Sequence, residues 1–193
     1  MGHGHDRGNG HGHDHGGDGK GRGEHDRVPS EHKARAPRSA KVYVITCSDS
    51  RTEATDEGGR IIRDALEEAG HALTGSAIIP DDPLRIAEEL ERAHVLGAEF
   101  ALVTGGTGLS SRDSTFEAIS RGVLRPLPGF GELFRSLSYE EIGSAAMLSR
   151  AVAGQLQSGL FVFAMPGSPA AVRLACEKLI LPELTHILEE LSR

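Results

Sequence analysis

Short apolar runs alternate along this chain with segments in which apolar residues recur every three or four positions. The continuous runs are rich in β-branched residues and predict buried strands over residues 42–46, 72–79, 99–103 and 160–164. The helical spacing between them predicts helices that end at Gly70 and Gly97, and a short helix over residues 115–120. Strands that alternate with helices are typical of an α/β fold with a parallel, doubly wound sheet.

The pattern is less regular in the C-terminal half. Residues 125–139 combine prolines and glycines with large apolar residues, which fits a subunit interface and equally fits core packing. Residues 141–153 predict a helix. Two amphipathic segments, 170–180 and 182–191, close the chain, and Pro182 separates them because proline has no backbone N–H to donate.

Residues 1–40 differ in composition from the rest of the chain. They contain 10 of the 25 glycines and 7 of the 10 histidines but scarcely any large aliphatic residue, so they cannot bury enough surface to offset backbone ordering. We therefore expect a disordered His/Gly-rich tail at 1–40 and a folded domain at 41–193. The histidines could bind a transition metal through imidazole, or the segment could be only a solubilising tail.

The tail is nearly neutral, and the formal net charge of −7 arises in residues 41–193, which carry 22 acidic and 14 basic residues. This acidity and an aromatic content of 4% argue against a nucleic-acid binder, which needs a basic surface and stacking side chains. No apolar run approaches the roughly 20 residues that span a bilayer, and no secretory segment follows Met1. We expect a cytoplasmic protein that binds no membrane.

The most informative stretch follows the predicted strand 99–103 and reads Thr104-Gly105-Gly106-Thr107-Gly108. A strand that leads into a glycine-rich turn exposes several backbone N–H groups, and such a turn can bind phosphate. The stretch lacks both the lysine of a Walker A loop and the third glycine of a dinucleotide fingerprint. A tight turn without a ligand is the alternative interpretation.

Polar or glycine-rich residues follow each predicted strand: Ser48-Asp49, Asp81-Asp82, the glycine loop with Asp113, and Gly167-Ser168. Ligands of open parallel sheets bind outside the carboxyl ends of the strands, so these loops are expected to share one site. Two carboxylates, Asp81 and Asp113, beside a phosphate-binding loop suit Mg²⁺-assisted phosphoryl or nucleotidyl transfer. Asp81 could instead cap the following helix, and Asp113 could be a turn residue or an ion-pair partner of Arg112.

Several short stretches are distributed over nearly all of residues 41–193: Ser48-Asp49, Ile79-Pro80-Asp81, the glycine loop with Arg112-Asp113-Ser114-Thr115, Pro128-Gly129-Phe130-Gly131-Glu132, Ser138-Tyr139-Glu140-Glu141-Ile142-Gly143, Ser149-Arg150-Ala151-Val152-Ala153-Gly154 and Met165-Pro166-Gly167-Ser168. In these stretches, and in their order along the chain, the sequence resembles the MoaB/Mog family of molybdenum cofactor biosynthesis proteins, of the molybdopterin adenylyltransferase type. Residues 1–40 lie outside the resemblance.

The resemblance implies a three-layer α/β/α domain with a mostly parallel sheet that assembles as a homotrimer, sometimes a hexamer. It also implies a reaction: the terminal phosphate of molybdopterin attacks the α-phosphorus of ATP, giving adenylylated molybdopterin and pyrophosphate, with Mg²⁺ required. The two essential aspartates of the family correspond to Asp81 and Asp113, which would position metal and phosphates. The other implied substrate-binding residues are Ser48, Gly105, Gly106, Thr107, Gly108, Ser149, Arg150, Gly167 and Ser168.

Some members of the MoaB type lack the first aspartate and, with it, the activity, whereas this chain keeps both Asp81 and Asp113. We therefore expect an active nucleotidyltransferase. The alternative is a non-catalytic molybdopterin-binding or carrier protein of the same pathway. A third interpretation assigns the function to the His-rich tail, as a metal-handling module on an inherited scaffold.

Overall fold

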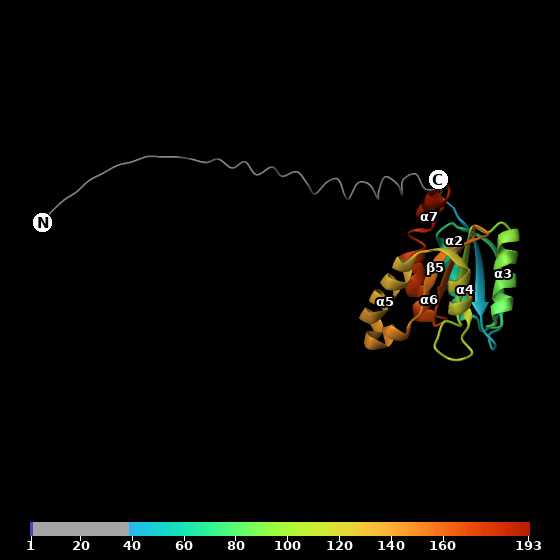
Figure 1. The fold of residues 1–193 in the computed structure, drawn as a ribbon, viewed down its shortest axis with the longest axis horizontal. Coiled ribbons are helices and arrows are strands. Elements are labelled where there is room, and N and C mark those ends of the chain that lie inside the picture. The colour runs from blue at the N-terminus through green and yellow to red at the C-terminus, as the bar shows by residue number, and fades with distance from the viewer. Residues whose placement is uncertain (2–38) are drawn as a thin grey trace. The chain divides into compact units, whose positions relative to one another are not determined.

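The computed structural model describes Met1 and residues 39–193 (Figure 1). The predicted disordered tail and its histidine clusters lie almost wholly outside these residues, so the tail and its metal stay predictions. Ala40, the last residue assigned to the tail, is fully buried, and its carbonyl accepts a hydrogen bond from the N–H of Ala72 at 2.9 Å. The ordered packing of the domain therefore includes Ala40.

The described residues form a six-stranded sheet with the strand order β2-β1-β3-β6-β5-β4. Its first four strands in this order are parallel, whereas β5 runs antiparallel to both β6 and β4. The strands are β1 (Lys41–Cys47), β2 (Ala72–Ile79), β3 (Phe100–Thr104), β4 (Val123–Pro126), β5 (Val152–Leu156) and β6 (Phe161–Met165). All four predicted strands are present, and the mostly parallel sheet confirms the predicted fold class.

Helices cover both faces of this sheet. They are α2 (Glu57–Glu68), α3 (Pro83–Val95), α4 (Thr115–Gly122), α5 (Pro128–Ile142), α6 (Pro169–Ala175) and α7 (Leu184–Leu191), with a 3-10 helix at Gly143–Leu148 and a π-helical turn at Cys176–Ile180. None of the helices in the described part of the chain is long and apolar enough to cross a membrane.

The core is divided by the sheet because successive side chains of a strand point to opposite faces. Val42 and Val44 of β1 pack in one cluster with residues of α2, α5, α6 and α7. Tyr43 and Ile45 pack in the other cluster with residues of α3 and α4. The result is the predicted three-layer domain, and β3 and β6, covered on both sides, are buried along their whole length.

The prediction of a helix over residues 141–153 is wrong. Gly143 adopts φ +61° and ends α5, a short 3-10 helix follows, and residues 152–156 form β5. Pairing with β4 and β6 thus overrides the helical preference of the alanines and leucines in this segment. Gly154 permits this pairing, because a Cβ atom there would lie 2.5 Å from the carbonyl oxygen of Arg125.

The segment 125–139 contains the end of β4 and most of α5. Phe130 and Phe134 are buried in the core, whereas Leu127 and Leu133 are exposed. Core packing therefore explains the aromatic residues, and the exposed leucines remain candidates for a subunit interface.

Candidate functional site

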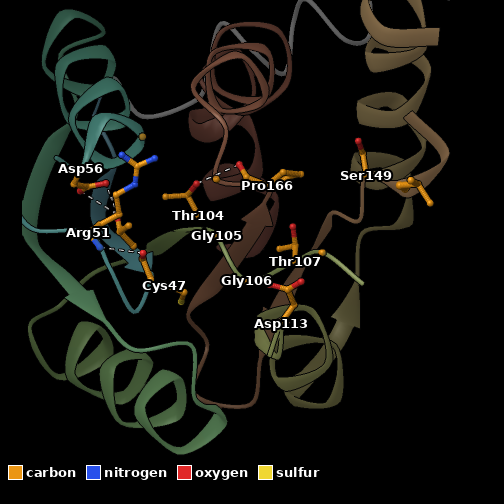
Figure 2. A pocket seen from close by; sticks show the side chains of 16 residues that line it. Cys47, Arg51, Asp56, Thr104, Gly105, Gly106, Thr107, Asp113, Ser149 and Pro166 are labelled. Atoms are coloured by element: carbon orange, nitrogen blue, oxygen red, sulfur yellow. Dashed lines mark hydrogen bonds between the residues drawn. The ribbon is translucent and has the colours of Figure 1, made fainter. Parts of the chain in front are cut away.

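A cavity of about 410 Å³ lies at the carboxyl ends of β1, β3 and β6 (Figure 2). Ligands of parallel α/β sheets bind at this edge. Of the predicted site residues, Asp81, Arg150 and Ser168 do not line the cavity. The residues that do line it are Ser48, Gly105, Gly106, Thr107, Gly108, Asp113, Ser149 and Gly167.

The glycine loop after β3 is tightly packed and left-handed at two positions. Gly105 and Gly106 have φ +95° and +63°, a conformation that L side chains rarely adopt. A Cβ atom at Gly105 would overlap the carbonyl oxygen of Cys47, and one at Gly106 would overlap the Asp81 carboxylate and the hydroxyl of Thr115. The glycines are therefore required by both backbone conformation and space.

This loop presents a row of unpaired donors. The N–H of Gly105 donates to the carbonyl of Met165 at 3.1 Å. By contrast, the next four N–H groups have no acceptor among residues 39–193; they belong to Gly106, Thr107, Gly108 and Leu109. Successive unpaired N–H groups along a cavity wall form a concavity that binds anions.

Asp81 lies behind the glycine loop and not on the cavity wall. Its carboxylate accepts hydrogen bonds from the N–H of Ser114 at 3.2 Å, the hydroxyl of Ser114 at 2.8 Å and the hydroxyl of Thr115 at 3.0 Å. Asp81 thus fixes the start of α4. It is not the cap of α3, because Asp82 accepts the N–H groups of Leu84 and Arg85 there.

Asp113 does line the cavity, as Figure 2 shows. Its Oδ2 accepts the N–H of Ser110 at 2.9 Å, so the residue also shapes its own turn. A Cβ atom on Gly108 would lie 2.6 Å from the same Oδ2. Glycine at this position therefore allows a carboxylate to pack directly against the anion-binding loop.

Arg112 pairs with Asp49 and not with the adjacent Asp113. The pair connects the loops after β3 and β1, but both side chains are exposed to solvent, so it contributes little stability. Ser48 shapes the first of these loops, because its hydroxyl accepts the N–H groups of Ser50 and Arg51 at 3.3 and 3.2 Å.

Arg150 contacts the glycine loop from outside the cavity. Its Nε donates to the carbonyl of Thr107 at 2.7 Å, and its Nη2 donates to the carbonyl of Gly108. The guanidinium is paired with Glu117 and lies over the ring of Phe116, with Cζ 4.7 Å from the ring centroid. The hydrogen bond from Arg150 lowers the pKa of Glu117, so the pair is charged at neutral pH.

The loop after β6 lies next to the glycine loop and contributes Gly167 to the cavity lining. Gly167 packs against Gly105, since a Cβ atom on Gly167 would lie 3.1 Å from the Cα of Gly105. The hydroxyl of Ser168 faces α6 as its N-cap and accepts the N–H of Ala171 at 3.4 Å. Ser149 lines the cavity beside Leu148 at the end of the 3-10 helix.

Asp56 is a buried cavity residue that the sequence analysis missed. It is 4% exposed, and its carboxylate accepts the hydroxyl of Thr46 at 3.1 Å and the N–H of Gly59 at 2.9 Å. Arg63 approaches it at 3.5 Å. The signal was present as an aspartate directly before the first turn of α2, which is a preferred N-cap position.

Cys47 also lines the cavity, but its thiol is not a nucleophile. Burial raises the pKa of Cys47 to about 12, with the Asp81 carboxylate contributing in the same direction. The thiol is therefore protonated at neutral pH and does not supply a thiolate nucleophile.

Comparison with known proteins identifies the family. Residues 43–186 match the family described as "Probable molybdopterin binding domain". The chain belongs to this family. Its similarity extends to Molybdenum cofactor biosynthesis protein B of Bacillus anthracis, which is 48% identical over 166 residues, covering 85% of this chain and 98% of that protein. The protein of the same name from Bacillus subtilis strain 168 is 46% identical over 169 residues, covering 84% and 96% of the two chains.

The fold of the chain is also similar to solved structures of molybdenum and tungsten cofactor biosynthesis proteins. A crystal structure of Molybdenum cofactor biosynthesis protein B shares 47% identity with a TM-score of 0.74, covering 82% of this chain and 99% of that chain. The tungsten cofactor synthesizing protein MoaB from Pyrococcus furiosus shares 37% identity with a TM-score of 0.75, covering 82% and 100%. The MoaB/Mog resemblance found in the sequence is confirmed.

Proposed function

We propose that the chain acts in molybdenum cofactor biosynthesis and catalyses Mg²⁺-dependent adenylyl transfer from ATP to the terminal phosphate of molybdopterin. The observation that carries the proposal is the row of N–H groups from Gly106 to Leu109 that have no acceptor among residues 39–193. Gly106, Thr107 and Gly108 line the cavity together with the Asp113 carboxylate. Such N–H donors bind phosphate oxygens, and a carboxylate on the same cavity wall can bind a cation that the phosphates also coordinate.

In the proposed reaction an oxygen of the terminal molybdopterin phosphate attacks the α-phosphorus of ATP. The bond from that phosphorus to the oxygen bridging to the β-phosphate breaks, and pyrophosphate leaves. The loop donors bind phosphate oxygens and hold them for the transfer, which proceeds by positioning and charge stabilisation. No covalent enzyme intermediate is needed, in keeping with the protonated thiol of Cys47.

The two aspartates that the sequence assigns to Mg²⁺ differ in position. Asp113 lines the cavity, while Oδ1 of Asp81 already accepts three donors and its Oδ2 faces Gly106. Within the described residues no cluster of three His, Cys, Asp or Glu side chains could hold a metal alone. This donor set fits Mg²⁺, which binds through one or two carboxylates plus substrate phosphates and there would neutralise phosphate charge.

We also propose the homotrimer or hexamer implied by the resemblance. Exposed apolar side chains of α5 and the following 3-10 helix give a surface for a second copy of the chain: Leu133, Tyr139, Ile142, Met147 and Leu148. Light scattering of the purified chain measures the assembly directly, and a monomer would contradict this assignment.

The function is tested by measuring pyrophosphate release and adenylylated-pterin formation from molybdopterin, ATP and Mg²⁺. We expect turnover by the unmodified chain, its loss in Asp81→Asn and Asp113→Asn with pterin binding retained, and normal turnover in the control Asp64→Asn. Asp64 is exposed on α2, and its only ion-pair partner among residues 39–193 is Arg60.

The second candidate is a non-catalytic molybdopterin-binding or carrier protein. It is favoured by the involvement of Asp81 in the start of α4, which leaves one of the two aspartates on the cavity wall. Pterin binding without any turnover in the unmodified chain would establish this candidate and exclude the enzyme.

A further inference from the structure

Arg150 holds the glycine loop through two successive carbonyl groups. Its guanidinium donates to the carbonyls of Thr107 and Gly108. Thr107 and Gly108 line the cavity, whereas Arg150 does not. The loop backbone therefore separates the guanidinium from the space where a ligand would bind.

These two hydrogen bonds set the direction of the loop N–H groups. In a planar trans peptide, the C=O of one residue and the N–H of the next point in opposite directions. Because the carbonyls of Thr107 and Gly108 are turned toward Arg150, the N–H groups of Gly108 and Leu109 point away from it. Both are among the donors that have no acceptor within the part of the chain that the structure describes.

The guanidinium also contacts two side chains in addition to the loop carbonyls. It pairs with Glu117, with Nη2 3.3 Å from Oε2, and stacks over Phe116. Its side chain is only 19% exposed. A charge that is paired in this way contributes little direct attraction to an incoming phosphate, while a rigid, planar fork is well suited to fixing two carbonyls.

We propose that Arg150 is a positioning residue that turns the N–H groups of Gly108 and Leu109 toward an anionic substrate, with Glu117 as its counterion. The inference deepens the proposed function and rests on it, because it takes the cavity to be a phosphate site. Lysine cannot replace the guanidinium here, since one ammonium group lacks the planar fork that reaches both carbonyls and the carboxylate.

The test measures binding of inorganic pyrophosphate to the full chain by calorimetry. We expect Arg150→Lys to lose roughly tenfold in affinity, as much as Arg150→Ala, because either change frees the loop. Guanidinium ion at millimolar concentration should restore part of the affinity of Arg150→Ala, and methylammonium should not. Glu117→Gln should stay within about twofold, because it leaves both hydrogen bonds from Arg150 to the loop carbonyls in place. The control Arg85→Lys should also stay within about twofold, because the only ion-pair partner of Arg85 in the described part of the chain is Glu88, on the exposed face of α3.

A direct phosphate ligand would behave differently. Arg150→Lys would then keep most of its affinity, and Glu117→Gln would bind pyrophosphate more tightly because it releases a positive charge; either result overturns the inference. If Arg150→Ala does not fold, Arg150→Lys and Glu117→Gln still decide the question. Failure of the unmodified chain to bind pyrophosphate overturns both proposals, whereas binding that depends on Arg150 without turnover supports this one and overturns the enzyme.

Discussion

Gly106 and Asp81 pack so closely that any side chain at position 106 would overlap the Asp81 carboxylate. The glycine comes from the loop after β3, and the aspartate comes from the loop after β2, on the other side of β1. The carboxylate thereby joins the anion-binding loop to the start of α4, through Ser114 and Thr115. An aspartate placed for catalysis on family grounds is thus also part of the loop's support.

This contact predicts a large effect of Gly106→Ala. The left-handed backbone alone costs an L residue about 1–2 kcal/mol, and displacement of Asp81 adds the loss of its hydrogen bonds. We expect a clear fall in the free energy of unfolding, measured in urea, and loss of pyrophosphate binding. The control is Gly129→Ala in α5, where a Cβ atom meets nothing within 4 Å; it should be neutral or slightly stabilising.

Asp56 predicts a second stability effect. Asp56→Ala removes the N-cap of α2 and leaves the hydroxyl of Thr46 and the N–H of Gly59 without their acceptor in a buried place. We expect a loss of about 2–4 kcal/mol in the free energy of unfolding. Asp64→Ala on the exposed face of the same helix should change it by less than about 0.5 kcal/mol, and equal effects of the two changes would contradict the cap.

Tyr43 gives a prediction for alkaline pH. Burial, and then its hydrogen bond to Glu89, raise the pKa of Tyr43 from 10.0 to about 12. Because the folded pKa is the higher one, this stabilisation is complete below about pH 10 and is lost as the pH rises toward 12. Tyr43→Phe should therefore be less stable than the unmodified chain at pH 8, where Glu89 loses its donor, and the difference should narrow above pH 10.

Chemical denaturation of both proteins between pH 8 and 11.5 measures this difference. Tyr139→Phe serves as the control, since Tyr139 is 64% exposed. A difference in unfolding free energy that stays constant over this range would show that the titration of Tyr43 is not coupled to folding.

The sequence predicts the parallel part of the fold because local signals and tertiary structure agree there. Residues 100–104 are apolar and β-branched, and they become a strand buried on both faces. In residues 152–156 the local sequence pattern and the tertiary structure disagree, since only pairing with β4 and β6 makes them a strand. Mixed sheets of this kind depend on contacts that a local pattern does not contain.

The same distinction applies to the site. Glycines and aspartates after predicted strands could be assigned to one edge of the sheet from topology alone, and Asp113 and the loop do lie there. The position of Asp81 behind Gly106 depends on the register of separate strands. The two carbonyls that Arg150 contacts lie 43 and 42 residues away in the sequence, so no motif could indicate that the arginine acts on the backbone.

The acidity of the domain gives a last prediction, on divalent ions. Residues 41–193 carry a net charge of −8, and Asp113 lies on the cavity wall, so the negative charges of free ATP meet an unfavourable field. Mg²⁺ offsets this repulsion by binding the phosphates and the carboxylate together. We expect the affinity for ATP, measured by calorimetry, to fall by about tenfold or more in EDTA and to return when Mg²⁺ is in excess. Asp113→Asn should reduce this dependence on Mg²⁺, because it removes one of the repelling charges and a ligand of the ion. Tight binding of ATP in EDTA would contradict the assignment of Asp113 to the metal and would leave the loop N–H groups as the main phosphate ligands.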